Sequence, residues 1–307
     1  MPRPPRPRRT LAGDAEIAGF GIFTNGSVTV RFHPAAAGTG VVFARTDLPG
    51  SPKVPAAIAH ADELHRRTGV SRGAAEVQLT EHVLAALAGL RVDDCRVELT
   101  NRELPGLDGS ARGFAEALLA AGFAEQPAVR PVLAVRRPVT VRRGDASVTA
   151  VPHEGFRVEY RFDGGPGFPV PPHTFAAEIT PESFATQIAP ARTFVTEAEV
   201  PALRAAGYGA RVDVADLLVF AEDGTPVGNA ARFPDEPARH KALDVVGDLA
   251  LLGCDLEAHV TSDRGGHALN RELCRALLAA AGTGDAAWIG GEPAAGGPAL
   301  RARRRAA

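Results

Sequence analysis

Two segments, one in each half of the chain, repeat the same succession of apolar and polar positions. The first contains EHVLAALAGLRVDDCRVEL and LDGSARGFAEALLAAG, and the second contains RHKALDVVGDLALLGCDLEAHV and SDRGGHALNRELCRALLAAAG. In each segment, apolar residues at helical spacing precede an apolar run, a polar loop and a second helical stretch. The pattern predicts an internal repeat of helix, strand, loop and helix.

Glycine stands where each of these helices is expected to end, as is common at helix C-termini. The predicted end residues are, in chain order, Gly89, Gly122, Gly253 and Gly282. At the start of the second half's first helix, Asp235 is a candidate cap and Pro237 suits the first turn.

Strand-like segments precede both repeats. They are SVTVRFHP and TGVVFARTDL in the first half, and VLAVRRPVTV, ASVTAVP and FRVEYRF in the second. Alternating apolar residues in SVTVRF and RVEYRF are typical of half-buried strands. We therefore expect an α+β protein of two similar domains, each a sheet with a helix pair on one face. The crevice between the facing layers is the natural place for a site.

The expected linker is EQPAVRP, residues 125–131, between an N-terminal domain (11–126) and a C-terminal domain (127–283). Residues 1–10 and 284–307 are rich in proline, glycine, alanine and arginine, and are predicted to be disordered basic tails. We interpret these tails as solvated chain ends. The alternative is that their positive charge attracts them weakly to anionic membrane lipid.

Composition narrows the function classes. A length of 307 residues suits roughly two domains, and a net charge of −2 gives no overall field for nucleic acid. No apolar run approaches the roughly 20 residues of a membrane span, and MPRPPRPRRT lacks the apolar stretch of a secretory signal. Cys95, Cys254 and Cys274 fit no disulfide or metal pattern. These features predict a reduced, cytoplasmic protein.

Lysine is nearly absent from the basic residues. Lysine and arginine together number 34, and the only lysines are Lys53 and Lys241. A lysine kept in so arginine-rich a chain indicates a need for a compact ammonium, which arginine cannot supply. The inference applies to Lys241 more than to Lys53, which lies in a proline-rich loop.

The helix predicted within residues 233–253 carries a polar stripe. His240, Asp244 and Asp248 recur at every fourth residue, so their side chains share one face. Imidazole and carboxylate one turn apart can chelate one ion and suit zinc, and three protein ligands plus water make a catalytic site. A solvent-exposed ion pair is the simpler interpretation of His240 and Asp244. Asp248 favours the metal site, since it lies in an apolar stretch where a buried acid needs a partner.

The third ligand of such a metal site must come from another part of the chain, and two histidines are candidates. His82 begins the equivalent helix of the first half, so pseudo-twofold packing would bring it near His240. His267, in RGGHALN, follows glycines that permit close approach to a ligand. The remaining histidines lack a supporting pattern and are expected to be structural or exposed: His33, His60, His65, His153, His173 and His259.

Glu81 directly precedes His82. A carboxylate close to a metal, but not bound to it, can take a proton from the attacking water. The order of acid and histidine differs from that of the HExxH zinc proteases, which argues against that group.

Together, LTEHVLAALAGLRVDDCRVEL, ELPGLDGSARGF, ARTF, RHKALDVVGDLALLG and RGGHALN resemble, in order, the UDP-3-O-acyl-N-acetylglucosamine deacetylase (LpxC) family over about residues 10–282. The resemblance implies two α+β domains with helices sandwiched between the sheets. It implies zinc-dependent hydrolysis of the N-acetyl group of UDP-3-O-acyl-N-acetylglucosamine, releasing acetate, the committed step of lipid A biosynthesis. It implies about one Zn²⁺ per chain, replaceable by Fe²⁺, a UDP-linked acylated glucosamine as partner, at most peripheral membrane contact, and a monomer.

The resemblance also assigns roles to residues. The implied zinc ligands are His82, His240 and Asp244. Glu81 would be the general base, and Thr193 would help to hold the oxyanion. His267 would be the general acid, kept cationic by Asp248, and Lys241 would support developing charge or bind substrate. Two residues would line or support the substrate site, Phe194 and Asp108.

Three departures mark a divergent member of this family. The usual GLHxG turn is GIFTNG, with Phe23 in place of histidine; RTFGF is RTFVT; and YGARVDVADLLVF, after Gly207, lacks the usual Gly-Gly-Ser. None removes a proposed ligand or proton carrier, but they affect expected substrate contacts. Residues 162–175, rich in proline and glycine, fall where the family builds part of its acyl-chain passage.

Three alternatives stay open. One is a zinc amidohydrolase of the same fold that acts on another N-acetylated sugar. Another is a non-catalytic relative, which the presence of Glu81 and every proposed ligand argues against. The last is a membrane-surface scaffold that acts through its basic tails.

Overall fold

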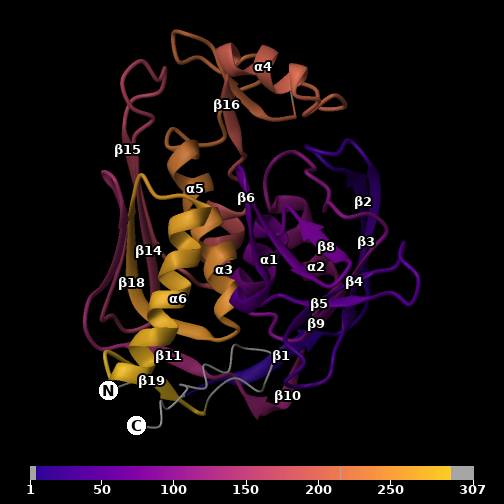
Figure 1. Cartoon of the computed structure of the whole chain (residues 1–307), viewed down its shortest axis with the longest axis vertical. Coiled ribbons are helices and arrows are strands. Elements are labelled where there is room, and N and C mark those ends of the chain that lie inside the picture. The colour runs from indigo at the N-terminus through magenta and orange to yellow at the C-terminus, as the bar shows by residue number, and fades with distance from the viewer. Residues whose placement is uncertain (1–4, 215, 292–307) are drawn as a thin grey trace, which may run out of the picture.

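Two layers of β-sheet flank a central layer of helices in the computed structural model, which describes residues 5–214 and 216–291 (Figure 1). The first half of the chain forms one outer layer and the second half forms the other. The predicted α+β class, with helices between two sheets, is confirmed. The arrangement places the two repeated helix pairs against one another.

The first half has a five-stranded sheet in the order β2-β3-β9-β4-β5 and a three-stranded sheet in the order β6-β7-β8. The strands are β2 (Ala15–Phe20), β3 (Ser27–Pro34), β4 (Val41–Arg45), β5 (Lys53–Pro55), β6 (Ala61–Leu64), β7 (Arg67–Arg72), β8 (Ala75–Gln78) and β9 (Cys95–Leu99). The helices are η1 (Ile58–His60), α1 (Glu81–Gly89) and α2 (Arg112–Ala121).

The second half has a seven-stranded sheet in which β18 is paired with β11, β13 and β14. Its strands are β11 (Val132–Val135), β12 (Val139–Arg143), β13 (Ala146–Val151), β14 (Phe156–Phe162), β15 (His173–Glu178), β18 (Asp255–Asp263) and β19 (Ala286–Ile289). The helices are α3 (Pro181–Ser183), η2 (Phe184–Ile188), η3 (Glu197–Glu199), α4 (Val200–Ala205), α5 (Glu236–Leu249), η4 (Ala250–Leu252) and α6 (His267–Thr283). A separate parallel pair is formed by β16 (Phe194–Thr196) and β17 (Leu218–Phe220).

Parts of the predicted tails that lie within the described residues form strands. Residues 7–10, expected in a disordered tail, belong to β1 (Pro7–Leu11), which pairs with β10 (Phe123–Val129). Ion pairs hold this strand in place. Arg8 is buried and forms an ion pair with Asp94 at 2.7 Å, and Arg6 forms ion pairs with both Asp93 and Asp255. Residues 286–289, also expected to be disordered, form β19 beside β11. The rest of the predicted tails, residues 1–4 and 292–307, lies outside the described residues.

The helix ends follow the predicted glycines with one exception. Helix α1 ends at Gly89, Gly122 follows α2, and Gly253 follows η4, which extends α5. Helix α6 passes the predicted end at Gly282 and stops before Gly284, whose φ of 86° favours glycine.

Asp235 occupies the N-cap position of α5 without making a cap hydrogen bond. Its carboxylate instead accepts a hydrogen bond from Arg239 Nε at 2.6 Å, so Asp235 stands at the predicted position but does not make the predicted cap hydrogen bond.

Helices α1 and α5 meet at the centre of the molecule. A Cβ atom added to Gly247 would lie 2.1 Å from the backbone oxygen of Glu81, so only glycine allows this approach. Both helices are buried along nearly their whole length, including the polar residues at their N-terminal ends. This contact carries Glu81 and His82 from the first half to the polar stripe of the second.

Candidate active site

A cavity of about 650 Å³ opens between the two halves, at the N-terminal ends of α1, α5 and α6. Most residues that the sequence assigned to a site lie on its wall: Glu81, His82, Thr193, Phe194, His240, Lys241, Asp244 and His267. Asp248 is completely buried behind this wall.

His82, His240 and Asp244 form one cluster in the cavity. Each offers a ligand atom, and these atoms lie within 4.8 Å of one another. The two imidazole rings stand 5.2 Å apart and nearly perpendicular, at 88°. The pseudo-twofold convergence of His82 and His240 expected from the repeat is therefore seen in the structure.

The cluster fits a divalent cation. Two of its buried atoms, His82 Nδ1 and Asp244 Oδ1, have no hydrogen-bond partner within the described residues, and such atoms are costly unless something binds them. His240 Nδ1 faces the Ala191 oxygen at 3.1 Å, which leaves Nε2 as a ligand atom. Two imidazoles and a carboxylate are a donor set that binds zinc.

The surroundings of the cluster favour, in all three side chains, the protonation state that can bind a metal ion. Burial, aided by the neighbouring His240, lowers the pKa of His82 to about 3, and burial also lowers the pKa of His240. Both imidazoles are therefore neutral near pH 7, with a lone pair to donate. Burial opposes ionisation of Asp244, but Lys241, whose Nζ lies 2.6 Å from Oδ2, holds the pKa of Asp244 well below its usual range.

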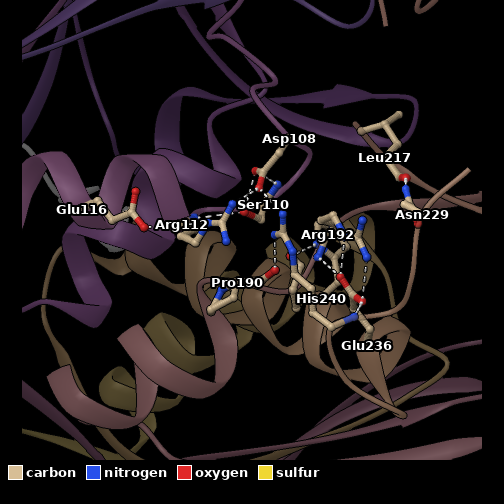
Figure 2. Close-up of polar contacts among 12 residues, drawn as sticks. Asp108, Ser110, Arg112, Glu116, Pro190, Arg192, Leu217, Asn229, Glu236 and His240 are labelled. Carbon is tan, nitrogen blue, oxygen red and sulfur yellow. Dashed lines mark hydrogen bonds and ion pairs between the residues drawn. The ribbon is translucent and has the colours of Figure 1, made fainter. Parts of the chain in front are cut away.

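Backbone that supports His240 is fixed by a buried ion pair (Figure 2). Arg192, next to the Ala191 carbonyl, donates from its backbone N and from Nε to Glu236 Oε1 at 3.0 and 2.9 Å. Glu236 Oε2 also accepts from the backbone N of Arg232 at 2.6 Å. Sequence reasoning assigned no role to Arg192 and Glu236, although Arg192 lies within ARTF and Glu236 lies within the helical segment 233–253.

Glu81 and His267 face each other across the cavity, with Oε1 and Nε2 3.9 Å apart. Burial raises the pKa of Glu81 to about 7, and the carboxylates of Asp244 and Asp248 add to this, although His267 opposes it. Burial opposes protonation of His267, but Asp248 and Asp244 outweigh it and raise its pKa to about 9. Near neutral pH this pair offers both a proton acceptor and a proton donor.

Asp248 is the partner that orients His267, with Oδ2 2.8 Å from Nδ1. The same oxygen accepts from Asn270 Nδ2 at 2.8 Å, and Oδ1 accepts from Thr68 Oγ1 at 2.5 Å. Asp248, the buried acid of the polar stripe, thus accepts hydrogen bonds from donors within the protein. Asn270 could have been found from its place one turn after His267, but nothing in the sequence marks Thr68.

Phe194 and Thr193 lie beside the cluster. The Phe194 ring stands 6.3 Å from that of His240 and 5.2 Å from that of Phe162. The Thr193 backbone N donates to Gly109 O at 2.7 Å, which fixes this residue against the first half.

Asp108 is not on the cavity wall. Its carboxylate accepts a hydrogen bond from Ser110 Oγ at 2.7 Å (Figure 2). It accepts another from Arg232 Nη2 at 2.7 Å. Arg232 comes from the second half, so Asp108 joins the two halves near the site.

Two departures from the expected family pattern contact each other. Asn25, in GIFTNG, donates to Gly207 O and accepts from the Ala210 backbone N, both at 2.7 Å. The Phe23 and Tyr208 rings pack edge to face at 5.1 Å. Phe23 and Tyr208 both line the cavity, so the departures form one contact at its wall.

A second crevice, of about 780 Å³, lies at the other ends of α1 and α5 and contains none of the predicted site residues. Within the described residues, no helix combines the length and apolar character needed to cross a membrane.

An α+β fold with a buried His-His-Asp cluster beside a carboxylate and a cationic imidazole defines the class of metal-dependent hydrolases. The chain belongs to the LpxC family, UDP-3-O-acyl N-acetylglycosamine deacetylase, whose family model matches residues 8–279. The family resemblance expected from the motifs is confirmed.

Individual relatives agree. The chain is 38% identical over 273 residues to the UDP-3-O-acyl-N-acetylglucosamine deacetylase of Thermosynechococcus vestitus, covering 88% of this chain and 93% of the relative. It is 34% identical over 296 residues to the deacetylase of Anaeromyxobacter dehalogenans, covering 96% and 94%. It is also 37% identical over 298 residues to the bifunctional enzyme LpxC/FabZ of Chlorobaculum tepidum. That match covers 88% of this chain but only 64% of the bifunctional enzyme.

Proposed function

We propose that the chain hydrolyses the N-acetyl group of UDP-3-O-acyl-N-acetylglucosamine and releases acetate, the committed step of lipid A biosynthesis. The observation that carries the proposal is that His82 and Glu81 of one half meet His240, Asp244 and His267 of the other in one cavity. Membership of the deacetylase family supplies the substrate class.

His82, His240 and Asp244 would hold the metal ion. When bound, the ion supplies a Lewis acid that polarises the acetamide carbonyl and makes water more acidic. We propose Zn²⁺, since two imidazoles and one carboxylate suit it, with Fe²⁺ as the alternative for the same donors. Lys241 holds the second oxygen of Asp244 and keeps the ligand carboxylate ionised.

Glu81 removes a proton from the attacking water. Its Oε2 accepts a hydrogen bond from the Thr68 backbone N at 3.0 Å, so the carboxylate is held with Oε1 toward His267. A pKa raised to about 7 makes it a stronger base than an exposed glutamate while a large fraction remains ionised near neutral pH.

His267 donates a proton to the amine nitrogen as the amide bond breaks. Its Nδ1–H bond to Asp248 leaves Nε2 facing the cavity as the donor. Thr193 and Lys241, on the same wall, would stabilise the oxyanion that forms from the carbonyl oxygen.

The cavity wall suits an acylated UDP sugar. Phe162, Phe194 and Val219 give it an apolar side for an acyl chain. Four arginines lie on the same wall and suit the diphosphate of a UDP sugar: Arg66, Arg143, Arg204 and Arg264.

The contact between Asn25 and residues 207–210 favours a second candidate, an amidohydrolase of the same fold acting on another N-acetylated sugar. These segments depart from the family pattern and line the cavity. Acetate release from the UDP-linked substrate and from simple N-acetylglucosamine, measured on the purified metal-loaded protein, separates the two. Turnover of the simple sugar with none of the UDP-linked substrate would contradict the leading proposal.

A further inference from the structure

Thr68 lies in β7, beneath the start of α1, and is completely buried. It is not on the cavity wall, so substrate does not reach it. All of its polar groups nevertheless form hydrogen bonds with residues of the site or with their immediate neighbours. We propose that Thr68 is a positioning residue that aligns the base Glu81 with the acid His267; the inference rests on the proposed function.

The backbone of Thr68 fixes the base. Its N–H donates to Glu81 Oε2 at 3.0 Å. Its carbonyl oxygen accepts from the backbone N and the hydroxyl of Thr80, at 3.0 and 3.3 Å. Because Thr80 directly precedes Glu81, these bonds hold the first turn of α1 against β7.

The Thr68 side chain fixes the acid. Its hydroxyl donates its one proton to Asp248 Oδ1 at 2.5 Å, and Oγ1 lies 3.3 Å from His267 Nδ1. Asp248 Oδ2 is already shared by His267 and Asn270. The Thr68 hydroxyl therefore completes the partners of a buried carboxylate and sets the plane in which it holds the imidazole.

One residue thus links groups from three elements in two halves of the chain. Glu81 comes from α1, Asp248 from α5 and His267 from the start of α6. General acid–base catalysis depends on such alignment, because a small misplacement of donor or acceptor weakens proton transfer. Without the hydroxyl, Asp248 Oδ1 loses this partner, and the carboxylate is held only through Oδ2, by His267 and Asn270.

The test is Thr68→Val, which keeps the shape and the backbone bonds but removes the hydroxyl. We expect kcat to fall roughly 10-fold to 100-fold, with KM and metal content unchanged. Thr68→Ser keeps the hydroxyl and restores most of kcat. Thr10→Val is the matched control, because Thr10 is buried in β1 and its hydroxyl donates to Asp94 O at 2.7 Å. Neither residue is on the cavity wall.

A second readout needs no turnover. In zinc-loaded protein with nitrogen-labelled histidine, the ring signals of His267, assigned by their loss in His267→Gln, should move in Thr68→Val and stay in place in Thr10→Val. Unmoved His267 signals, or kcat equal to that of the unmodified chain, would overturn the inference. If the unmodified chain releases no acetate, the proposed function fails, and the His267 signals still decide on Thr68. Thr68→Ala serves for both readouts if Thr68→Val does not fold.

Discussion

The Glu81 carboxylate and the His267 imidazole lie 3.9 Å apart between Oε1 and Nε2, although 185 residues separate them along the chain. Each belongs to a different half; Glu81 is buried, and His267 is partly buried. Glu81 begins α1, which meets α5 closely at Gly247. His267 begins α6 and is held to α5 through Asp248. The proposed chemistry therefore depends on the interface between the halves.

The dependence of kcat/KM on pH should be bell-shaped. Glu81 must be ionised, so activity rises with pH through its pKa, which burial raises to about 7. His267 must be protonated, so activity falls above its pKa, which Asp248 and Asp244 raise to about 9 against burial. A bound cation moves both limbs to lower pH, because positive charge favours the carboxylate and disfavours the imidazolium. The alkaline limb should disappear in His267→Gln, and a rise that continues to high pH would contradict this assignment.

Gly247→Ala should destabilise the protein by about 1–3 kcal/mol through overpacking. The new Cβ would lie 2.1 Å from the Glu81 backbone oxygen, so α1 and α5 must separate. Urea unfolding measures the loss, and kcat should fall because Glu81 moves with α1. Gly282→Ala is the control: its Cβ meets nothing within 4 Å in α6, so stability should rise by up to about 1 kcal/mol. Equal effects of the two substitutions would contradict the close helix contact.

Glu236→Ala should cost about 3–5 kcal/mol, because it leaves Arg192 buried without its carboxylate. The metal affinity should also fall, since the Ala191 carbonyl that orients His240 loses its support. Glu116→Ala, which breaks an exposed pair with Arg112 at 3.8 Å, should change stability by less than about 0.5 kcal/mol. Chemical denaturation and metal titration of both variants check this, and a stable Glu236→Ala protein with unchanged affinity would refute it.

Asn25→Ala should raise KM by roughly 2-fold to 10-fold, because that is the effect expected from the net free energy of about one hydrogen bond. The substitution removes both side-chain bonds to the 207–210 segment on the cavity wall. Both kcat and metal content should stay the same, because Asn25 contacts none of the proposed ligands or proton carriers. Steady-state kinetics with the UDP-linked substrate gives the answer, and an unaltered KM would mean that this contact does not shape the substrate site.

Much of the architecture could be predicted because periodicity encodes it directly. The alternation in SVTVRFHP and FRVEYRF matches β3 and β14, and the repeat places two helix pairs against each other. The spacing of His240, Asp244 and Asp248 places them on one helix face, which the structure bears out.

What could not be predicted depends on contacts between distant residues. Arg6 and Arg8 resemble a solvated tail by composition. The carboxylates of Asp93 and Asp94, 87 and 86 residues away along the chain, fix them in or beside β1. Thr68 has no local signature, since its role arises only when β7, α1 and α5 pack together. The contact of Asn25 with residues 207–210 likewise joins segments that look unrelated along the chain.

The most direct measurement is acetate release from UDP-3-O-acyl-N-acetylglucosamine by the unmodified chain and by Glu81→Ala, with bound metal determined in the same samples. We predict about one metal ion per chain in both, chelator-sensitive acetate release by the unmodified chain, and loss of roughly 100-fold or more in Glu81→Ala. A folded, metal-free protein, or a Glu81→Ala variant as active as the unmodified chain, would contradict the account.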